Sequence, residues 1–219
     1  MMVLTVWSVR ISSDSAVGQD APVSSAPETS ERVASILAAA CRVVVREGAH
    51  GLRMATVAQE AGVSKALVHY YFSTRQELMR SAFAWSEEQW QAALRDQVRE
   101  LATGAERLQH ALLLSVETAE PSNNPRALWN EVWSSLRYDD ALRPLVDSAY
   151  RGWLDRLGAF IEEGQRDGSI PGPVVAAEAA WRLAAVGDGL DSMLYLGLLG
   201  QDEARELMRG SIRREIAGG

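Results

Sequence analysis

The side chains best suited to chemistry in this chain gather in one short segment that begins near residue 64. Lys65 and Tyr70 can donate hydrogen bonds to phosphate oxygens, and His69 can reach a base edge. Ala66 is small enough to let a helix lie close in a major groove. Ordinary core packing beside a solvated surface is the alternative interpretation. If the segment does contact DNA, the candidate residues are Arg53, Ser64, Lys65, Ala66, His69, Tyr70, Tyr71, Thr74 and Arg75.

Two short helices joined by a tight turn must position these side chains. Gly62 supplies the positive φ that such a turn needs, and Ser64 can cap the next helix by accepting a hydrogen bond from a free amide. That helix is expected over residues 65–72. Apolar residues at helical spacing after Met54 predict the preceding helix, so residues 53–72 are expected to form a helix-turn-helix. The inner side of the second helix should carry Val68, Tyr71 and Phe72.

Several short motifs follow one another in order along this part of the chain: an amphipathic first helix, the Gly48 break, Val57-Ala58, Ala61-Gly62-Val63-Ser64, Tyr71-Phe72, and Arg75 with Glu77-Leu78. With them, the run from about Arg32 to Phe83 resembles the N-terminal domain of the tetracycline-repressor (TetR) family of transcription factors. The resemblance implies operator DNA as a partner. Two positions depart from the family pattern, because Arg53 stands where a capping Thr is usual and His69 where a Tyr is common. The target sequence is therefore not implied.

The charge of the chain is unevenly distributed. The formal net charge is −7 over 219 residues, which at first argues against an anionic partner such as DNA. Residues 28–80, however, hold seven Lys or Arg against five acids, a balance of +2, whereas residues 81–219 hold fourteen Arg against twenty-two acids, a balance of −8. Lys65 is the only Lys in the chain. The acidic total therefore belongs to the second region and leaves a DNA-binding first region possible.

No segment shows the alternation of a β-strand, so we expect an all-α protein of about nine helices. Residues 12–29 are rich in Ser, Ala, Pro and Asp, and residues 1–29 are expected to form a flexible arm. Residues 30–80 should form a three-helix DNA-binding domain, and residues 81–219 a helical domain for effector binding and dimerisation. Besides the helix-turn-helix, the expected helices cover residues 30–47, 74–101, 105–119, 125–137, 140–166, 174–198 and 202–216.

Aromatic residues in the second region follow helical spacing. Trp129 and Trp133 share one helix face, and Tyr150 and Trp153 share another. Such rings are often simply core, but together with Trp181 they also suit the apolar walls of a small-molecule pocket. The polar contact could come from Glu131, His110 or Asp188. Each has a plainer interpretation: Glu131 as a surface carboxylate, His110 as a residue without a partner at metal spacing, and Asp188 as part of a helix irregularity.

The region from Leu128 to Gly168, with Trp181 to Leu199, is similar to the C-terminal domain of the BetI-like branch of the TetR family. The resemblance implies an unidentified small-molecule effector and a homodimer built by the last two helices, here 174–198 and 202–216. A broad apolar surface on these helices agrees with that interpretation. A two-fold dimer would place two recognition helices on successive major grooves of a pseudo-palindromic operator.

Other classes of protein find little support in the sequence. Three His residues fall in no ligand spacing and the lone Cys41 lies in an apolar stripe, so we expect no enzyme, no metal and no cofactor. A ligand-independent DNA-binding protein or an activator of the same fold stays open. The apolar start of the chain lacks the basic leading region of a secretory signal, and no segment has the roughly 20 apolar residues of a membrane span. A cytoplasmic protein is expected.

Overall fold

In a computed structural model of the protein, the described residues are 26–117, 125–136 and 140–216, and they form nine α-helices and no strand. The expectation of an all-α fold with about nine helices is confirmed. The α-helices are α1 (Ala26–Glu47), α2 (Met54–Ala61), α3 (Lys65–Tyr71), α4 (Arg75–Val98), α5 (Gly104–Ser115), α6 (Pro125–Ser135), α7 (Arg143–Asp167), α8 (Ala176–Tyr195) and α9 (Gln201–Ile216), and the 3₁₀ helices are η1 (Ala49–Gly51) and η3 (Asp140–Leu142).

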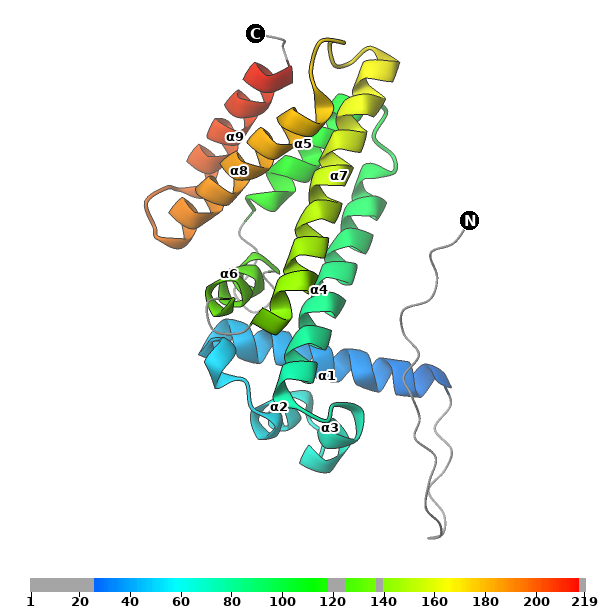
Figure 1. Cartoon of the computed structure of the whole chain (residues 1–219), viewed down its shortest axis with the longest axis vertical. Coiled ribbons are helices and arrows are strands. Elements are labelled where there is room, and N and C mark those ends of the chain that lie inside the picture. The colour runs from blue at the N-terminus through cyan, green and yellow to red at the C-terminus, as the bar shows by residue number, and fades with distance from the viewer. Residues whose placement is uncertain (1–25, 118–124, 137–139, 217–219) are drawn as a thin grey trace.

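The helices occupy two ends of an elongated molecule. Figure 1 shows α1, α2 and α3 at one end, and α5, α8 and α9 at the other, with the long α4 and α7 running between them. At the first end two glycines set the chain direction. Gly48, with φ of 76°, ends α1, and Gly62, with φ of 67°, makes the turn between α2 and α3. Both conformations are unfavourable for residues with a Cβ, so the predicted turn has the geometry that its glycine indicated.

The two largest differences between expected and observed helix boundaries are four residues each, about one turn. The first helix begins at Ala26 rather than Ser30, so residues 26–29 are helical and not part of an arm; the rest of the proposed arm, residues 1–25, lies outside the described residues. Pro27 falls in the first turn of α1, where its missing amide costs no helical hydrogen bond. The fifth helix ends at Ser115 rather than residue 119. There the Ser115 hydroxyl donates to the Leu112 carbonyl at 2.8 Å, in competition with the next helical bond.

Two hydrophobic cores hold the molecule together. The first is formed by α1, α2, α3 and the start of α4, with Ile36, Val57 and Phe83 fully buried. It also includes Leu128 and Val132 of α6, so residues far beyond position 80 pack against the N-terminal helices. The second core joins the end of α4 to α5, α7, α8 and α9. None of the helices built from the described residues combines the length and apolar character that a membrane span requires.

Helix α4 contributes to both cores. Leu78 and Phe83 near its start are buried in the first core, and Leu94 and Val98 near its end are buried in the second. A single straight element therefore connects the two ends of the molecule, as Figure 1 shows. No loop separates the part of α4 in the first core from the part in the second.

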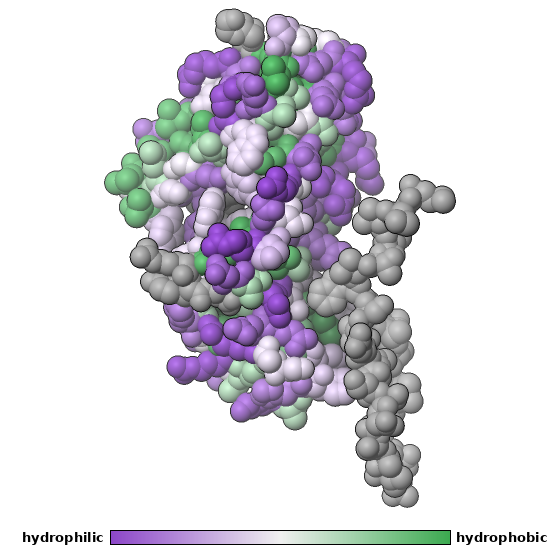
Figure 2. Space-filling model, in the orientation of Figure 1, coloured by the Kyte–Doolittle hydropathy of each residue, from purple (hydrophilic) through white to green (hydrophobic). Residues whose placement is uncertain are grey.

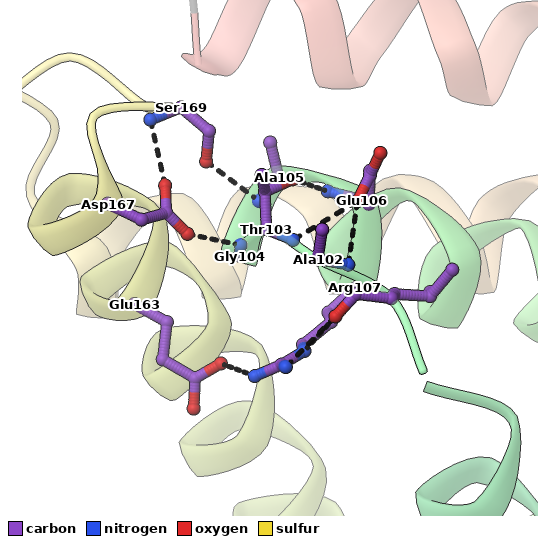
Figure 3. Close-up of polar contacts among 10 residues, drawn as sticks. Ala102, Thr103, Gly104, Ala105, Glu106, Arg107, Glu163, Asp167 and Ser169 are labelled. Atoms are coloured by element: carbon purple, nitrogen blue, oxygen red, sulfur yellow. Dashed lines mark hydrogen bonds and ion pairs between the residues drawn. The ribbon is translucent and has the colours of Figure 1, made fainter. Parts of the chain in front are cut away.

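Helices α5 and α7 are fixed to each other where α5 begins. A Cβ added at Gly104 would lie 2.1 Å from the Gly164 amide nitrogen, so only glycine permits this approach. The Gly104 amide donates to the Asp167 carboxylate at 2.7 Å, and the Ala105 amide donates to the Ser169 hydroxyl at 3.2 Å (Figure 3). Hydrogen bonds to the Asp167 carboxylate lower its pKa, the largest effect coming from the Ser169 side chain and the next from the Gly104 amide. The first amides of α5 are thus satisfied by the end of α7.

Candidate nucleic-acid interface and aromatic cavity

Local contacts fix the start and the inner face of α3. The Leu67 amide donates to Ser64 Oγ at 3.1 Å, which is the cap that the sequence predicted. Val68 is fully buried and Phe72 nearly so, and both belong to the first core. Since these anchors hold one side of a two-turn helix, the opposite side of α3 must point away from the core.

The outward side of α3 carries the predicted contact residues. Lys65, Ala66, His69 and Tyr70 are exposed, and Tyr70 has 79% of its surface accessible. Tyr71 is different, because it is half-buried against the first core and packs edge-on to Tyr70 with ring centroids 5.0 Å apart. Figure 1 places α3 at the opposite end of the molecule from α9. This face can therefore approach a large partner such as duplex DNA without obstruction from the C-terminal helices.

The flanking candidates have distinct local roles. Thr74 caps α4 by accepting a hydrogen bond from the Glu77 amide at 3.1 Å. Arg53 is exposed at the first position before α2 and makes no side-chain cap, in agreement with the departure noted in the sequence. The Arg75 guanidinium donates to the carbonyl of Ala49, in the turn after α1. Arg75 therefore ties the start of α4 to that turn, in addition to any contact with DNA.

An ion-pair cluster braces α2 against α1. Glu60 accepts hydrogen bonds from Arg42 Nε at 2.8 Å and from Arg46 Nη1 at 2.9 Å. These two hydrogen bonds, that from Arg42 first, lower the pKa of the Glu60 carboxyl. Helix α2, the first helix of the helix-turn-helix, is therefore held on α1 by charge as well as by the buried Val57.

The predicted aromatic residues of the second region do come together. Trp129 and Trp133 of α6 lie with ring centroids 6.5 and 6.2 Å from Tyr150 of α7, and all three ring pairs are edge-to-face. Trp153 packs in the same way on Trp90 of α4, at 5.2 Å. These distances are in the range of favourable aromatic pairs. Rings from three helices therefore surround one region between the two cores.

Two small chambers lie within this aromatic region. One, of about 40 Å³, has walls from α4, α5, α6 and α7, and the other, of about 50 Å³, extends to α8. Trp129, Tyr150 and Trp153 line both chambers, and the second shares Trp133 with a surface groove of about 460 Å³. Trp181 is not part of these walls, because it packs on Tyr150 at 6.0 Å with 55% of its surface exposed.

Carboxylates accompany the rings at the cavity wall. Asp188 accepts a hydrogen bond from the Tyr150 hydroxyl at 2.6 Å, and the buried Asp191 accepts one from Asn130 at 3.3 Å. Glu87 of α4 accepts a hydrogen bond from the indole of Trp129. The described lining of the chambers and groove includes no Lys or Arg. The cavity is consequently aromatic and acidic.

The remaining polar candidates lie elsewhere. Glu131 is half-buried and accepts a hydrogen bond from the Ala49 amide at 3.2 Å, so its interpretation as a surface carboxylate was wrong. His110 pairs with Gln97 at 2.8 Å on the outside of α5. Cys41 packs beside the first core, and burial raises the pKa of its thiol to about 12. Among the described residues, no group of three or more His, Cys, Asp or Glu side chains could hold a metal ion.

Comparison with known families agrees with both halves of the structure. Residues 36–82 match the model of bacterial regulatory proteins of the tetR family, and residues 104–217 match that of the BetI-type transcriptional repressor, C-terminal domain. The chain belongs to the TetR family. It is thus a transcriptional regulator with a DNA-binding N-terminal domain, and not an enzyme.

Similar regulators come from several bacteria. The HTH-type transcriptional regulator BetI of Paraburkholderia phymatum is 27% identical over 161 residues, which are 73% of this chain and 79% of the relative. The fatty acid metabolism regulator protein of Bacillus subtilis is 26% identical over 137 residues, 62% of this chain and 69% of the relative. A putative transcriptional regulator from Saccharomonospora viridis, solved in complex with choline, is 28% identical with a TM-score of 0.77, covering 85% of this chain and 98% of that one.

In this TetR-family regulator, sequence reasoning missed the part of the cavity that α4 supplies. Trp90 and Glu87 line the inner chamber, yet the helix expected over residues 74–101 was given no part in the ligand pocket. Their spacing of three residues, which places a ring and a carboxylate on one face of α4, was the available signal. Asn130 and Asp191 were also missed, since nothing in their local sequence indicates that α6 and α8 meet.

Proposed function

We propose that this protein is a repressor that binds a pseudo-palindromic operator as a homodimer. Its affinity for the operator changes, in either direction, when a small quaternary ammonium cation binds in the aromatic cavity. The DNA contacts are assigned to the exposed face of α3, chiefly Lys65, His69 and Tyr70. Arg53 and Thr74 lie beside it at the starts of α2 and α4, where they can contact phosphate.

The side chains that line the cavity favour a cation as its ligand. The faces of Trp and Tyr rings attract cations, and a quaternary ammonium has no N–H to donate, so aromatic walls suit it better than hydrogen-bond acceptors. Asp188, Asp191 and Glu87 add carboxylates to the wall beside these rings. The choline complex of the similar Saccharomonospora viridis regulator supports the same class of ligand.

The size of the cavity agrees with a small ligand. Chambers of about 40 and 50 Å³ each have room for only a few water molecules, which favours a small ligand over a large one. A long acyl chain does not fit these chambers without movement of their walls. The open groove beside Trp133 gives such a ligand a path to solvent.

The dimer is assigned to α8 (Ala176–Tyr195) and α9 (Gln201–Ile216), the helices expected over residues 174–198 and 202–216. Figure 2 shows hydrophobic side chains gathered over the turn between these helices. A contiguous apolar patch of this kind usually marks a surface that another protein covers. The exposed large apolar residues in and beside these two helices are Val175, Trp181, Met193, Tyr195, Leu196, Leu198 and Leu207.

A titration of tryptophan fluorescence tests the cation proposal. Choline should change the emission saturably, because Trp129, Trp133 and Trp153 line the cavity. The neutral isostere in which carbon replaces the nitrogen of choline should bind at least about tenfold more weakly, since each cation–ring contact contributes about 0.5–2 kcal/mol. Asp188→Asn should weaken the binding of choline and leave the affinity for the isostere unchanged. Equal binding of choline and its isostere, or binding of neither, would reject a cation site.

A further inference from the structure

Helix α6 lies between the cavity and the DNA-binding helices and presents different side chains to each. Trp129 and Trp133 face the cavity. Glu131 is two residues from each and therefore about 200° around the helix from Trp129, on the other side of α6. Figure 1 shows α6 between α1 and α8, which matches this division.

Three consecutive residues of α6 make hydrogen bonds to three different parts of the molecule. The Trp129 indole donates to Glu87 of α4, the Asn130 amide donates to Asp191 of α8, and Glu131 accepts from the Ala49 amide of η1 at 3.2 Å. The first two acceptors belong to the cavity wall. Residues 129–131 thus join that wall to the turn that follows α1.

The turn that Glu131 holds lies where the DNA-binding helices are connected. The Ala49 amide donates to Glu131, and the Ala49 carbonyl accepts from Arg75, the first residue of α4. Gly48, just before it, has φ of 76°, and a Cβ there would lie 3.2 Å from the Glu131 carboxylate. The turn therefore has both the backbone shape and the space that the carboxylate requires. Helices α2 and α3 are the segment enclosed between Ala49 and Arg75.

We infer that Glu131 is a positioning residue that couples the aromatic cavity to the orientation of the DNA-binding helices. A ligand that displaces the aromatic face of α6 must also displace the carboxylate on its opposite face. The hydrogen bond from the Ala49 amide to Glu131, here called the clamp, then weakens or shifts. Helices α2 and α3 move with it, because Arg75 at the start of α4 is hydrogen-bonded to the carbonyl of the same residue. This inference rests on the proposed function for the existence of a cavity ligand, but the clamp itself is independent of which ligand binds.

The test measures how choline changes the affinity for DNA. The dissociation constant for the protein's own upstream DNA is determined with and without saturating choline, and the ratio of the two is the coupling. Wild-type protein should give a ratio of at least about fivefold. Glu131→Ala should still bind choline and DNA, but with a ratio below about twofold. Glu131→Gln, whose amide oxygen can accept from Ala49, should recover most of the coupling.

Glu162→Ala, which removes an exposed carboxylate of α7, is the matched control and should keep the wild-type ratio. If Glu131→Ala does not fold, Glu131→Asp, which keeps the charge but is one methylene shorter, takes its place. A Glu131→Ala protein, or the Glu131→Asp protein in its place, that binds both choline and DNA with the wild-type ratio would overturn the inference.

A second readout separates this inference from the proposed function. If choline leaves the DNA affinity of the wild-type protein unchanged, the effector assignment fails, and hydrogen exchange then decides on the clamp. The Ala49 amide should exchange at least about tenfold faster in Glu131→Ala than in wild type or Glu131→Gln, because its acceptor is lost. Equal exchange in all three proteins would show that Glu131 does not hold the turn.

Discussion

The position of Lys65 bears both on the stability of α3 and on its contact with DNA. Lys65 is the only Lys in the chain and the first residue of α3, with an exposed side chain. A positive charge at a helix N-terminus is slightly unfavourable for the helix itself. Its position is therefore better explained by a contact with an anionic partner than by stability.

Replacement of Lys65 should weaken DNA binding without loss of stability. Lys65→Ala removes one phosphate contact, so the affinity for DNA should fall about equally for all sequences. The slope of log affinity against log salt concentration should become shallower by about one. Tyr70→Ala should weaken binding as well, with a larger effect on the preferred sequence. Fluorescence anisotropy at several salt concentrations measures both, with Arg166→Ala on α7 as the control. An unchanged salt slope in Lys65→Ala would contradict the assignment.

Arg53 offers a test in which stability and binding move in opposite directions. It occupies the cap position of α2 without a capping bond. Arg53→Thr should add that bond and raise the free energy of unfolding by about 1 kcal/mol, while DNA affinity falls through loss of a phosphate contact. Urea unfolding at fixed protein concentration measures the first effect. A variant that is no more stable than wild type would show that the cap is not formed.

At the scale of elements, the sequence predicted what depends on neighbouring residues. The Gly62 turn and the Ser64 cap are local, and both are found as expected. The spacing of Trp129 and Trp133 also placed their rings together. Contacts between distant segments were not predictable in this way. Glu131 meets Ala49, which is 82 residues away, and no local pattern distinguishes this carboxylate from those on the surface.

The junction of α5 and α7 leads to a stability prediction. A Cβ at Gly104 would clash with the backbone of Gly164 and with the Phe160 carbonyl, neither of which can rotate away. Gly104→Ala should therefore lower the free energy of unfolding by about 3 kcal/mol. The control is Gly158→Ala in α7, where a Cβ meets nothing within 4 Å and a gain of up to about 1 kcal/mol is expected. Thermal unfolding compares the two variants. A Gly104→Ala protein with the melting temperature of the wild type would refute the close approach of α5 to α7.

At the scale of the whole molecule, DNA recognition and ligand binding are assigned to separate regions, the first to one end and the second to the cavity between the two cores. The acidic residues of the region beyond position 80 include those of the cavity wall, whereas the DNA-binding end has a small positive balance of seven basic residues against five acids over residues 28–80. Helix α4 belongs to both cores and α6 contacts both ends. Ligand and DNA can thus influence each other through packed elements, although they are expected to bind far apart.

The proposed dimer predicts that binding to DNA depends on α9. Leu207→Glu places a charge on the exposed apolar side of this helix and should shift the protein to monomers. Since a single recognition helix contacts only half an operator, DNA affinity should drop at least about tenfold. Analytical ultracentrifugation and DNA titration measure the two effects, with Gln109→Glu on α5 as the control. A Leu207→Glu protein that remains dimeric would move the interface elsewhere.

The most direct test of the central claim is a mobility-shift titration with the DNA upstream of the protein's own coding sequence, with and without choline. We expect a saturable, salt-sensitive shift that prefers this DNA over a scrambled duplex, and an affinity that choline changes by at least about fivefold. A protein that binds both duplexes equally, or neither, would contradict the account of α3 as the helix that recognises a specific DNA sequence.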